Sequence, residues 1–359
     1  MDKASEALSQ QVDFEEITSV VSSNFEFEEA LVEHNVPTYY LKQPQETKEA
    51  FLRLLQRLES ANLIAFLRRK GERTVLRVVP KPPVKPSNIM VNWILFFATI
   101  ATTFITGYML SEGLVEAGMM PNPFFGGATF TVAIMAVLGM HEMGHKLAAD
   151  RREIESTAPY FIPGPPPIFG MFGIGTFGAV ILQSSLPPNK DALFDVGASG
   201  PILGFVLAAV VSVVGLLFSP MFPIEGGENF LPSPLIFSLF AVYVVKLPAD
   251  YYITLHPVAF AGWVGMVVTM LNLLPAAMLD GGHVARSLVG ERARTVLTFL
   301  SIALLVVEGF WPMAFLVFFM SMRRHPGPLD DVSSLSERRK FLTILVIAIF
   351  VLSSFLPLF

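Results

Sequence analysis

The sequence predicts an all-α polytopic membrane protein with six or seven transmembrane helices, preceded by a small α+β soluble module. Of the 359 residues, 53% are hydrophobic and 15% are charged, whereas roughly a quarter of the residues in soluble proteins are charged. Several apolar runs reach the roughly 18 residues that a helix needs to cross a bilayer. Because the first part of the chain is polar, we expect a soluble module over residues 1–87 and a membrane domain over 88–359.

Charge and cysteine content narrow the possible functions. The formal net charge of −5 is mild and gives no indication of nucleic-acid binding. The chain has no cysteine, which excludes disulfides, thiolate metal ligands and cysteine catalysis. Any metal ion must therefore be held by histidine and carboxylate side chains.

The soluble module divides into an acidic and a basic part. Residues 1–34 carry nine acidic residues and one lysine without a sustained apolar period, so we expect this segment to be flexible. Residues 42–85 reverse the balance, with eleven basic against four acidic residues. The apolar spacing there predicts an amphipathic helix around 50–58 and a β-hairpin with strands over 62–67 and 74–79. The basic face is either a solvated surface or a contact for anionic lipid headgroups.

Long apolar runs mark the transmembrane helices. The clearest ones cover residues 88–110, 128–149, 197–219, 257–278 and 341–357. A further run over 295–322 is interrupted at 308–312, so it forms either one long span or a hairpin of two short spans. These alternatives correspond to six and seven crossings.

Basic residues in the loops predict the orientation. The loop 111–127 has two glutamates and no basic residue, so we place it outside, whereas the arginine-containing loops after the second and fourth spans and after 295–322 lie inside. This arrangement favours seven crossings and a cytoplasmic N-terminal module. Since the N-terminus is polar and shows neither a signal peptide nor a transit peptide, we expect the plasma membrane of a prokaryote, and more narrowly of an archaeon.

The segment His141-Glu142-Met143-Gly144-His145 lies at the end of the second apolar run. On a helix, this spacing puts two imidazoles one turn apart on the same face, as a zinc ion requires. The glutamate between them is placed to act as the base in metal-assisted hydrolysis. Ionisable groups at membrane depth are expensive to insert and indicate a functional site. We therefore predict that His141 and His145 bind a metal ion.

A catalytic zinc ion takes a third protein ligand, and the best candidate is Asp280. It follows the apolar span 257–278, which is broken at Pro275 and ends on the same side of the membrane as the histidines. A carboxylate beside a helix break at this depth needs a partner, which a metal would supply. In the alternative interpretation, Asp280 only caps the span and Gly281-Gly282 form its turn.

Together these motifs resemble the site-2 protease family of intramembrane zinc metalloproteases, peptidase family M50. The family combines H-E-x-x-H in one span with N-x-x-P-x-x-x-L-D-G in a later one, a pattern that runs here from Asn272 to Gly281. Other stretches look closest to the plant-chloroplast and archaeal branch, which in plants includes the "ethylene-dependent gravitropism-deficient and yellow-green" proteases. These stretches are residues 158–163, 172–182, 193–195 and 199–201.

The resemblance implies one Zn²⁺ per chain, held by His141, His145 and Asp280, with Glu142 as the general base. It also implies a three-helix metalloprotease core built from the spans 128–149, 197–219 and 257–278. The implied activity is the hydrolysis of peptide bonds in or near transmembrane helices. The partners would then be transmembrane protein substrates and the lipid bilayer.

Several further features have more than one interpretation. Asn272 is either a catalytic hydrogen-bond donor or a partner for a carbonyl freed near Pro275, and His283 is either a donor near the metal or incidental. Residues 170–183 alternate like a β-hairpin and resemble the family's membrane-dipping β element. Its edge either pairs with an unwound substrate or only packs against the core. Small residues suit the third span to tight packing on the metal helix, namely Gly197, Ser199, Gly200 and Gly204.

Two other functions stay open from the sequence. A prenyl-protein-type membrane zinc endopeptidase would take its third ligand from a glutamate in a later helix, for which Glu308 is the candidate. A catalytically inactive relative would act as a membrane chaperone or transporter. The intact H-E-x-x-H and L-D-G motifs argue against the second alternative, because a protein freed from catalysis need not keep Glu142.

Overall fold

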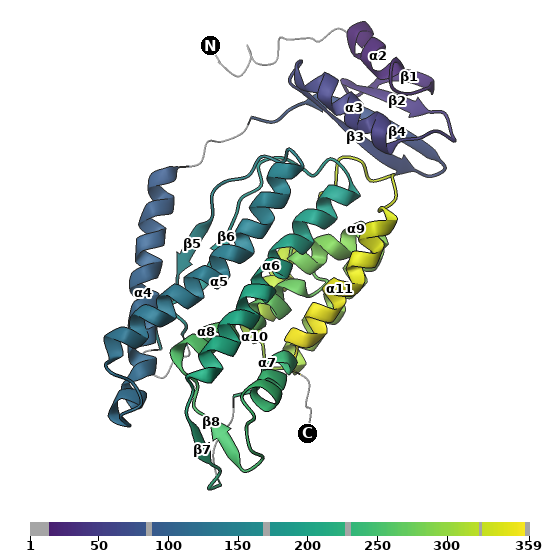
Figure 1. Cartoon of the computed structure of the whole chain (residues 1–359). Helices are drawn as coiled ribbons and strands as arrows, with labels where there is room; N and C mark the ends of the chain where they lie inside the picture. Colours follow the sequence, from purple (N-terminus) through teal and green to yellow (C-terminus); the bar gives the residue numbers. More distant parts are fainter. Residues whose placement is uncertain (1–13, 84–87, 168–172, 227–230, 323–324, 356–359) are drawn as a thin grey trace. The chain divides into compact units, whose positions relative to one another are not determined.

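The computed structural model describes residues 14–83, 88–167, 173–226, 231–322 and 325–355 (Figure 1). The chain divides into two structural units. The first unit takes residues 1–85, 186–193 and 326–336, and the second takes the rest.

Within its described residues, the first unit is an antiparallel sheet with the two helices α2 and α3 (Figure 1). Its elements are α2 (Phe14–Ser22), β1 (Phe27–Glu33), β2 (Val36–Leu41), α3 (Lys48–Glu59), β3 (Leu63–Lys70) and β4 (Arg73–Pro80), with the strand order β1-β2-β4-β3. The helix and strands expected around 50–58, 62–67 and 74–79 correspond to α3, β3 and β4. The apolar face of α3 places Phe51 and Leu54 in a core with Tyr39 of β2 and Leu76 of β4.

The expectation that residues 1–34 are flexible is wrong for residues 14–34. Helix α2 buries Ile17 and Val21 in the core, and β1 pairs with β2 along its length. In this segment the acidic side chains alternate with the apolar ones. The average composition therefore does not reveal the short amphipathic helix and the strand. Residues 1–13 lie outside the described residues.

Two segments that the sequence assigned to the membrane domain belong to the first unit. Leu186, Leu329 and Val332 pack against its core. The buried carboxylate of Asp330 accepts hydrogen bonds from the backbone amides of Val332 and Ser333, at 2.9 and 3.0 Å. A single domain boundary after residue 87 cannot assign these two segments to the first unit, because their placement depends on contacts between residues far apart in sequence.

The second unit is a bundle of helices with two small sheets (Figure 1). Its helices are α4 (Ile89–Glu116), α5 (Pro123–Arg151), most of α6 (Lys190–Leu217), α7 (Leu235–Leu239), the π-helical η1 (Phe240–Val244), α8 (Pro257–Leu273), α9 (Asp280–Val307), α10 (Trp311–Ser321) and α11 (Glu337–Ser353). The antiparallel strand pairs are β5 (Tyr160–Pro163) with β6 (Thr176–Val180) and β7 (Met221–Pro223) with β8 (Tyr251–Ile253). Among the described residues, α4, α5 and α6 are long and apolar enough to cross a membrane.

Helices α5, α6 and α8 share one hydrophobic core, to which Ile134, Ala208 and Met266 contribute. Glycines bring the helices close together. A Cβ atom on Gly265 of α8 would lie 2.6 Å from Cγ1 of Val137 in α5. Such close backbone approach is how helices associate where the hydrophobic effect does not drive them together.

The apolar run 295–322 is split between two helices. Helix α9 ends at Val307 and α10 begins at Trp311. Between them Gly309 has a φ of +81°, which glycine adopts without steric cost. A second interruption at Gly290, with φ +79° and ψ −177°, divides α9 itself.

The β element differs from the expected hairpin within 170–183. Strand β6 lies in that range, but its partner is β5, which ends at Pro163, the first residue of the proline-rich segment 163–167. The alternating pattern identifies a strand but does not identify its partner. Residues 170–172 lie outside the described residues.

Asp195 of α6 ties together the ends of two other helices. Its carboxylate accepts hydrogen bonds at 2.6 Å from both Nε and Nη2 of Arg339 in α11. It also accepts one at 2.9 Å from Nε of Arg152, which follows α5. Charge-assisted bonds of this kind are the strong ones in proteins, so the start of α6 is anchored beside the end of α5.

Candidate metal centre

The H-E-x-x-H motif lies in the last third of α5. Asn122 caps the helix by accepting a hydrogen bond from the Phe125 amide, and the helix then runs to Arg151. His141, Glu142 and His145 are 4%, 7% and 6% exposed. The two imidazole rings lie one turn apart with their centroids 4.9 Å from each other.

Asp280 reaches these rings from a distant part of the chain. Helix α8 ends at Leu273, because Pro275 cannot continue it, and α9 begins at Asp280 after a short loop. The Oδ2 atom of Asp280 lies 3.1 Å from Nε2 of His141 and 3.3 Å from Nε2 of His145. No side-chain cap is formed at the start of α9. The carboxylate therefore faces the histidines and does not act only as a helix cap.

The three side chains fit a zinc ion. Their ligand atoms all lie within 4.8 Å of one another, and within the described part of the chain they form the one such cluster of histidine and acidic groups. Ligands about 2.0–2.2 Å from zinc at tetrahedral angles are about 3.3–3.6 Å apart, close to the distances from Asp280. Two imidazoles and a carboxylate are typical zinc donors and leave a fourth position for water or substrate.

Helix α6 orients the histidines. Nδ1 of His145 lies 2.7 Å from the Val196 carbonyl oxygen and donates to it, which leaves Nε2 to bind the metal. Glycines of α6 form the small-residue face expected from the sequence. A Cβ atom on Gly200 would lie 2.1 Å from Nε2 of His145, and one on Gly204 would lie 2.8 Å from Nδ1 of His141.

Glu142 and Asn272 lie beside the ligands. The buried Glu142 carboxylate interacts with the backbone of Ile181, the residue that follows β6. The side-chain Nδ2 of Asn272, in the last turn of α8, is 3.4 Å from Nε2 of His141. Both side chains are thus within reach of a substrate at the metal, while the catalytic role of each stays a prediction.

Comparison with known proteins agrees with this geometry. Residues 129–308, which include the three candidate ligands, match the family described as peptidase family M50. The chain belongs to this family. No solved structure matches it.

Chloroplast proteins of plants are among the relatives of this M50 chain. It is 32% identical over 299 residues to the probable zinc metalloprotease EGY2 of Arabidopsis thaliana, which covers 77% of this chain and 51% of the relative. It is 30% identical over 232 residues to the probable zinc metalloprotease EGY1 of Oryza sativa subsp. japonica, which covers 61% of this chain and 39% of the relative. The chain thus spans about half or less of the length of these relatives.

Two other histidines of the M50 chain form a pair that the sequence did not indicate. His283 lies one turn after Asp280 in α9, and its Nδ1 is 2.8 Å from Nε2 of His325. His325 lies outside the helices and strands, yet it is 7% exposed. A separation of 42 residues without a shared motif leaves no sequence signal for this contact.

Glu308 is not positioned to complete the metal site. It is exposed and lies just after the end of α9, whereas Asp280 is at the start of that helix. Family membership and this placement both oppose the prenyl-protein-type endopeptidase.

Proposed function

We propose that this chain is an intramembrane zinc metalloprotease that hydrolyses peptide bonds in or near the transmembrane helices of membrane proteins. The observation that carries the proposal is the convergence of His141, His145 and Asp280 in a buried part of a unit with three potential membrane-spanning helices. Membership of peptidase family M50 and relatives named as probable zinc metalloproteases support it.

The residues around the site can perform the proton transfers of peptide hydrolysis. A zinc ion held by the three ligands would supply Lewis-acid activation of water and of the scissile carbonyl. Glu142 takes a proton from the attacking water and delivers it to the leaving amine. The amide of Asn272 donates a hydrogen bond to the oxygen that becomes negative in the transition state. Burial of Glu142 keeps competing water away and strengthens these interactions.

The substrate must present an unpaired backbone to the site. The amides of a transmembrane helix are paired internally, so cleavage requires local unwinding. Strand β6 is paired with β5 on one side, and the residue after it, Ile181, interacts with Glu142. An unwound segment that adds to the other edge of β6 would therefore be led to the catalytic carboxylate.

The membrane arrangement that we propose has seven crossings and a cytoplasmic N-terminal module in the plasma membrane of a prokaryote. The split of 295–322 into α9 and α10 supports two short crossings in this region. The excess of arginine and lysine in the predicted inner loops supports the orientation.

The Glu142→Gln variant tests the proposed chemistry. We expect it to bind zinc like the wild type and to lose proteolysis by a factor of roughly 10²–10⁴, because the amide cannot take up a proton. The measurement is cleavage of a transmembrane substrate by the purified full chain in detergent or lipid, together with the zinc content of each preparation. Undiminished cleavage by this variant would refute the role of Glu142.

A further inference from the structure

The loop that leads to Asp280 contains an unusual backbone conformation at Ala277. This buried residue has a φ of +45°, in the left-handed region that residues with a side chain rarely adopt. Its amide donates a hydrogen bond of 3.0 Å to Oγ1 of Thr298. Its carbonyl accepts one of 2.9 Å from Nη1 of Arg294. Both polar backbone groups of Ala277 are thus held by side chains of α9.

The break at Gly290 makes these contacts possible. It divides α9 into a first part that begins at Asp280 and a second part that carries Arg294 and Thr298. In a straight helix with a rise of 1.5 Å per residue, Arg294 and Thr298 would lie roughly 21 and 27 Å from Asp280 along the helix axis. The change in direction lets the second part return to the loop before Asp280.

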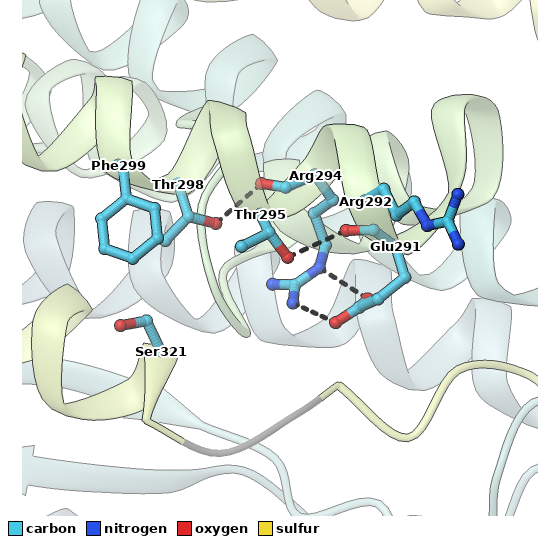
Figure 2. A pocket seen from close by; sticks show the side chains of 7 residues that line it. All are labelled: Glu291, Arg292, Arg294, Thr295, Thr298, Phe299 and Ser321. Carbon is cyan, nitrogen blue, oxygen red and sulfur yellow. Dashed lines mark hydrogen bonds and ion pairs between the residues drawn. The ribbon is translucent and has the colours of Figure 1, made fainter.

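Glu291 joins the two parts of α9 across the break. Its carboxylate accepts hydrogen bonds from Nε and Nη2 of Arg294, at 3.0 and 2.7 Å (Figure 2). It also pairs with Arg286 of the first part, with 3.1 Å between the charged atoms. The paired geometry fixes the guanidinium of Arg294, whose side chain is 5% exposed, in the orientation that reaches Ala277.

The loop and the first turn of α9 are in direct backbone contact. A Cβ atom on Gly281 would lie 2.1 Å from the Leu273 carbonyl oxygen, and one on Gly282 would lie 2.5 Å from the Ala276 carbonyl oxygen. A shift of Ala277 therefore moves the backbone that carries Asp280. The two glycines are needed for this close approach, which a turn alone would not require.

We propose that Arg294 is a positioning residue for the metal site, and that it acts with Thr298 by holding Ala277 so that the Asp280 carboxylate faces His141 and His145. This inference rests on the proposed metal function of those three residues. A buried guanidinium is costly unless it is paired, and the contacts of Arg294 with Glu291 and Ala277 are all directed at the Asp280 loop and the break in α9. Groups that orient a metal ligand without binding the metal themselves commonly contribute ten- to a hundredfold to the metal affinity.

The structure provides a matched control beside Arg294. A cavity of about 680 Å³ is lined by both Arg294 and Arg292. Arg292 is exposed, and its guanidinium points away from the pair formed by Arg294 and Glu291 (Figure 2). Replacing Arg292 removes a positive charge from the same cavity and leaves the contacts to Ala277 in place.

The experiment measures the zinc affinity of the full chain by competition with a chelator. We expect Arg294→Ala and Thr298→Val to weaken zinc binding about ten- to a hundredfold. Arg292→Ala and Thr298→Ser, which keep the contacts to Ala277, should bind like the wild type. The visible absorption of the Co²⁺-substituted protein should change in the first two variants only, because it reports the geometry of the ligands. Asp280→Ala serves as the reference for a lost ligand.

Wild-type zinc affinity and an unchanged Co²⁺ spectrum in both Arg294→Ala and Thr298→Val would overturn the positioning role while leaving the metal site intact. If Arg294→Ala does not fold, the pair Thr298→Val and Thr298→Ser decides the question. Valine keeps the size of threonine but lacks the hydroxyl that accepts from the Ala277 amide, whereas serine keeps the hydroxyl and lacks the methyl group. A wild-type chain that binds no stoichiometric zinc would refute the proposed function itself, and the positioning role with it.

Discussion

At the scale of single residues, the geometry of the site depends on how closely helix α6 approaches the histidine side chains of α5. The H-E-x-x-H spacing puts His141 and His145 on one face of α5, but their rings have room only because α6 presents glycines to them. Val196, on the same stretch of α6, accepts the hydrogen bond from His145 that orients its ring. The candidate ligands thus depend on residues that carry no chemistry of their own.

Gly200→Ala tests this dependence. The added Cβ atom would lie 2.1 Å from Nε2 of His145, so the ring or helix α6 must shift. Overpacking of this kind costs roughly 1–3 kcal/mol, and we expect zinc affinity to fall by roughly tenfold or more. The control is Gly113→Ala in α4, where a Cβ atom meets nothing within 4 Å. Equal zinc affinity of both variants and the wild type would show that the contact does not constrain His145.

At the scale of elements, strand β6 is the proposed link between the candidate metal centre and a substrate. It is short, follows Gly173 and Gly175, and contains Gly178. It is held by β5 and by α4, where the Thr102 hydroxyl donates to the Gly175 carbonyl at 2.6 Å. Phe177, in β6, has 74% of its surface exposed. An exposed aromatic ring on a strand that leads to Glu142 is suited to contact an incoming segment.

Phe177→Ala should weaken the use of a transmembrane substrate. We expect KM to rise roughly tenfold, the size of a lost apolar contact, while kcat and zinc content stay near the wild-type values. Phe341→Ala in α11 removes a ring of similar exposure, 70%, away from β6 and should leave KM unchanged. If kcat falls and KM does not change, β6 supports the site and does not bind substrate.

At the scale of the whole molecule, the candidate site residues lie in one of the two units. The candidate ligands, Glu142 and the Arg294 contacts all belong to the second unit, which includes residues 86–185 and 194–325. The first unit is assembled from three separate stretches and has its own core around Phe51 and Leu76. Of its returning segments, 186–193 includes the first four residues of α6, and 326–336 immediately precedes α11 in sequence.

The proposed membrane topology can be measured because the chain has no cysteine of its own. Single cysteines at Met119 and Glu308 should react with an impermeant maleimide from outside, since seven crossings place both there. Single cysteines at Arg151 and Ser334 should react only after permeabilisation. A Glu308→Cys variant that stays unlabelled in intact cells would exclude two crossings by α9 and α10.

Local sequence patterns were sufficient to predict much of this protein's structure. The spacing of His141 and His145, the apolar runs and the break at Pro275 are local features, and each follows from helix geometry or from the cost of polar groups in lipid. The general location of β6 and the interruption near Gly309 could be predicted for the same reason. The flexibility expected over residues 1–34 was wrong for residues 14–34, because average composition hides short amphipathic elements.

The amino-acid sequence by itself determined the donor types of the site and the helices that carry them, since periodicity and the absence of cysteine restrict both. The tertiary structure alone decided which distant groups meet: Asp280 with the two imidazoles, Arg294 with Ala277, and His283 with His325. These encounters depend on how glycines let helices approach and where α9 bends. Contacts between residues far apart in sequence produce no periodic pattern in a single sequence. They could therefore be assigned only from the tertiary structure.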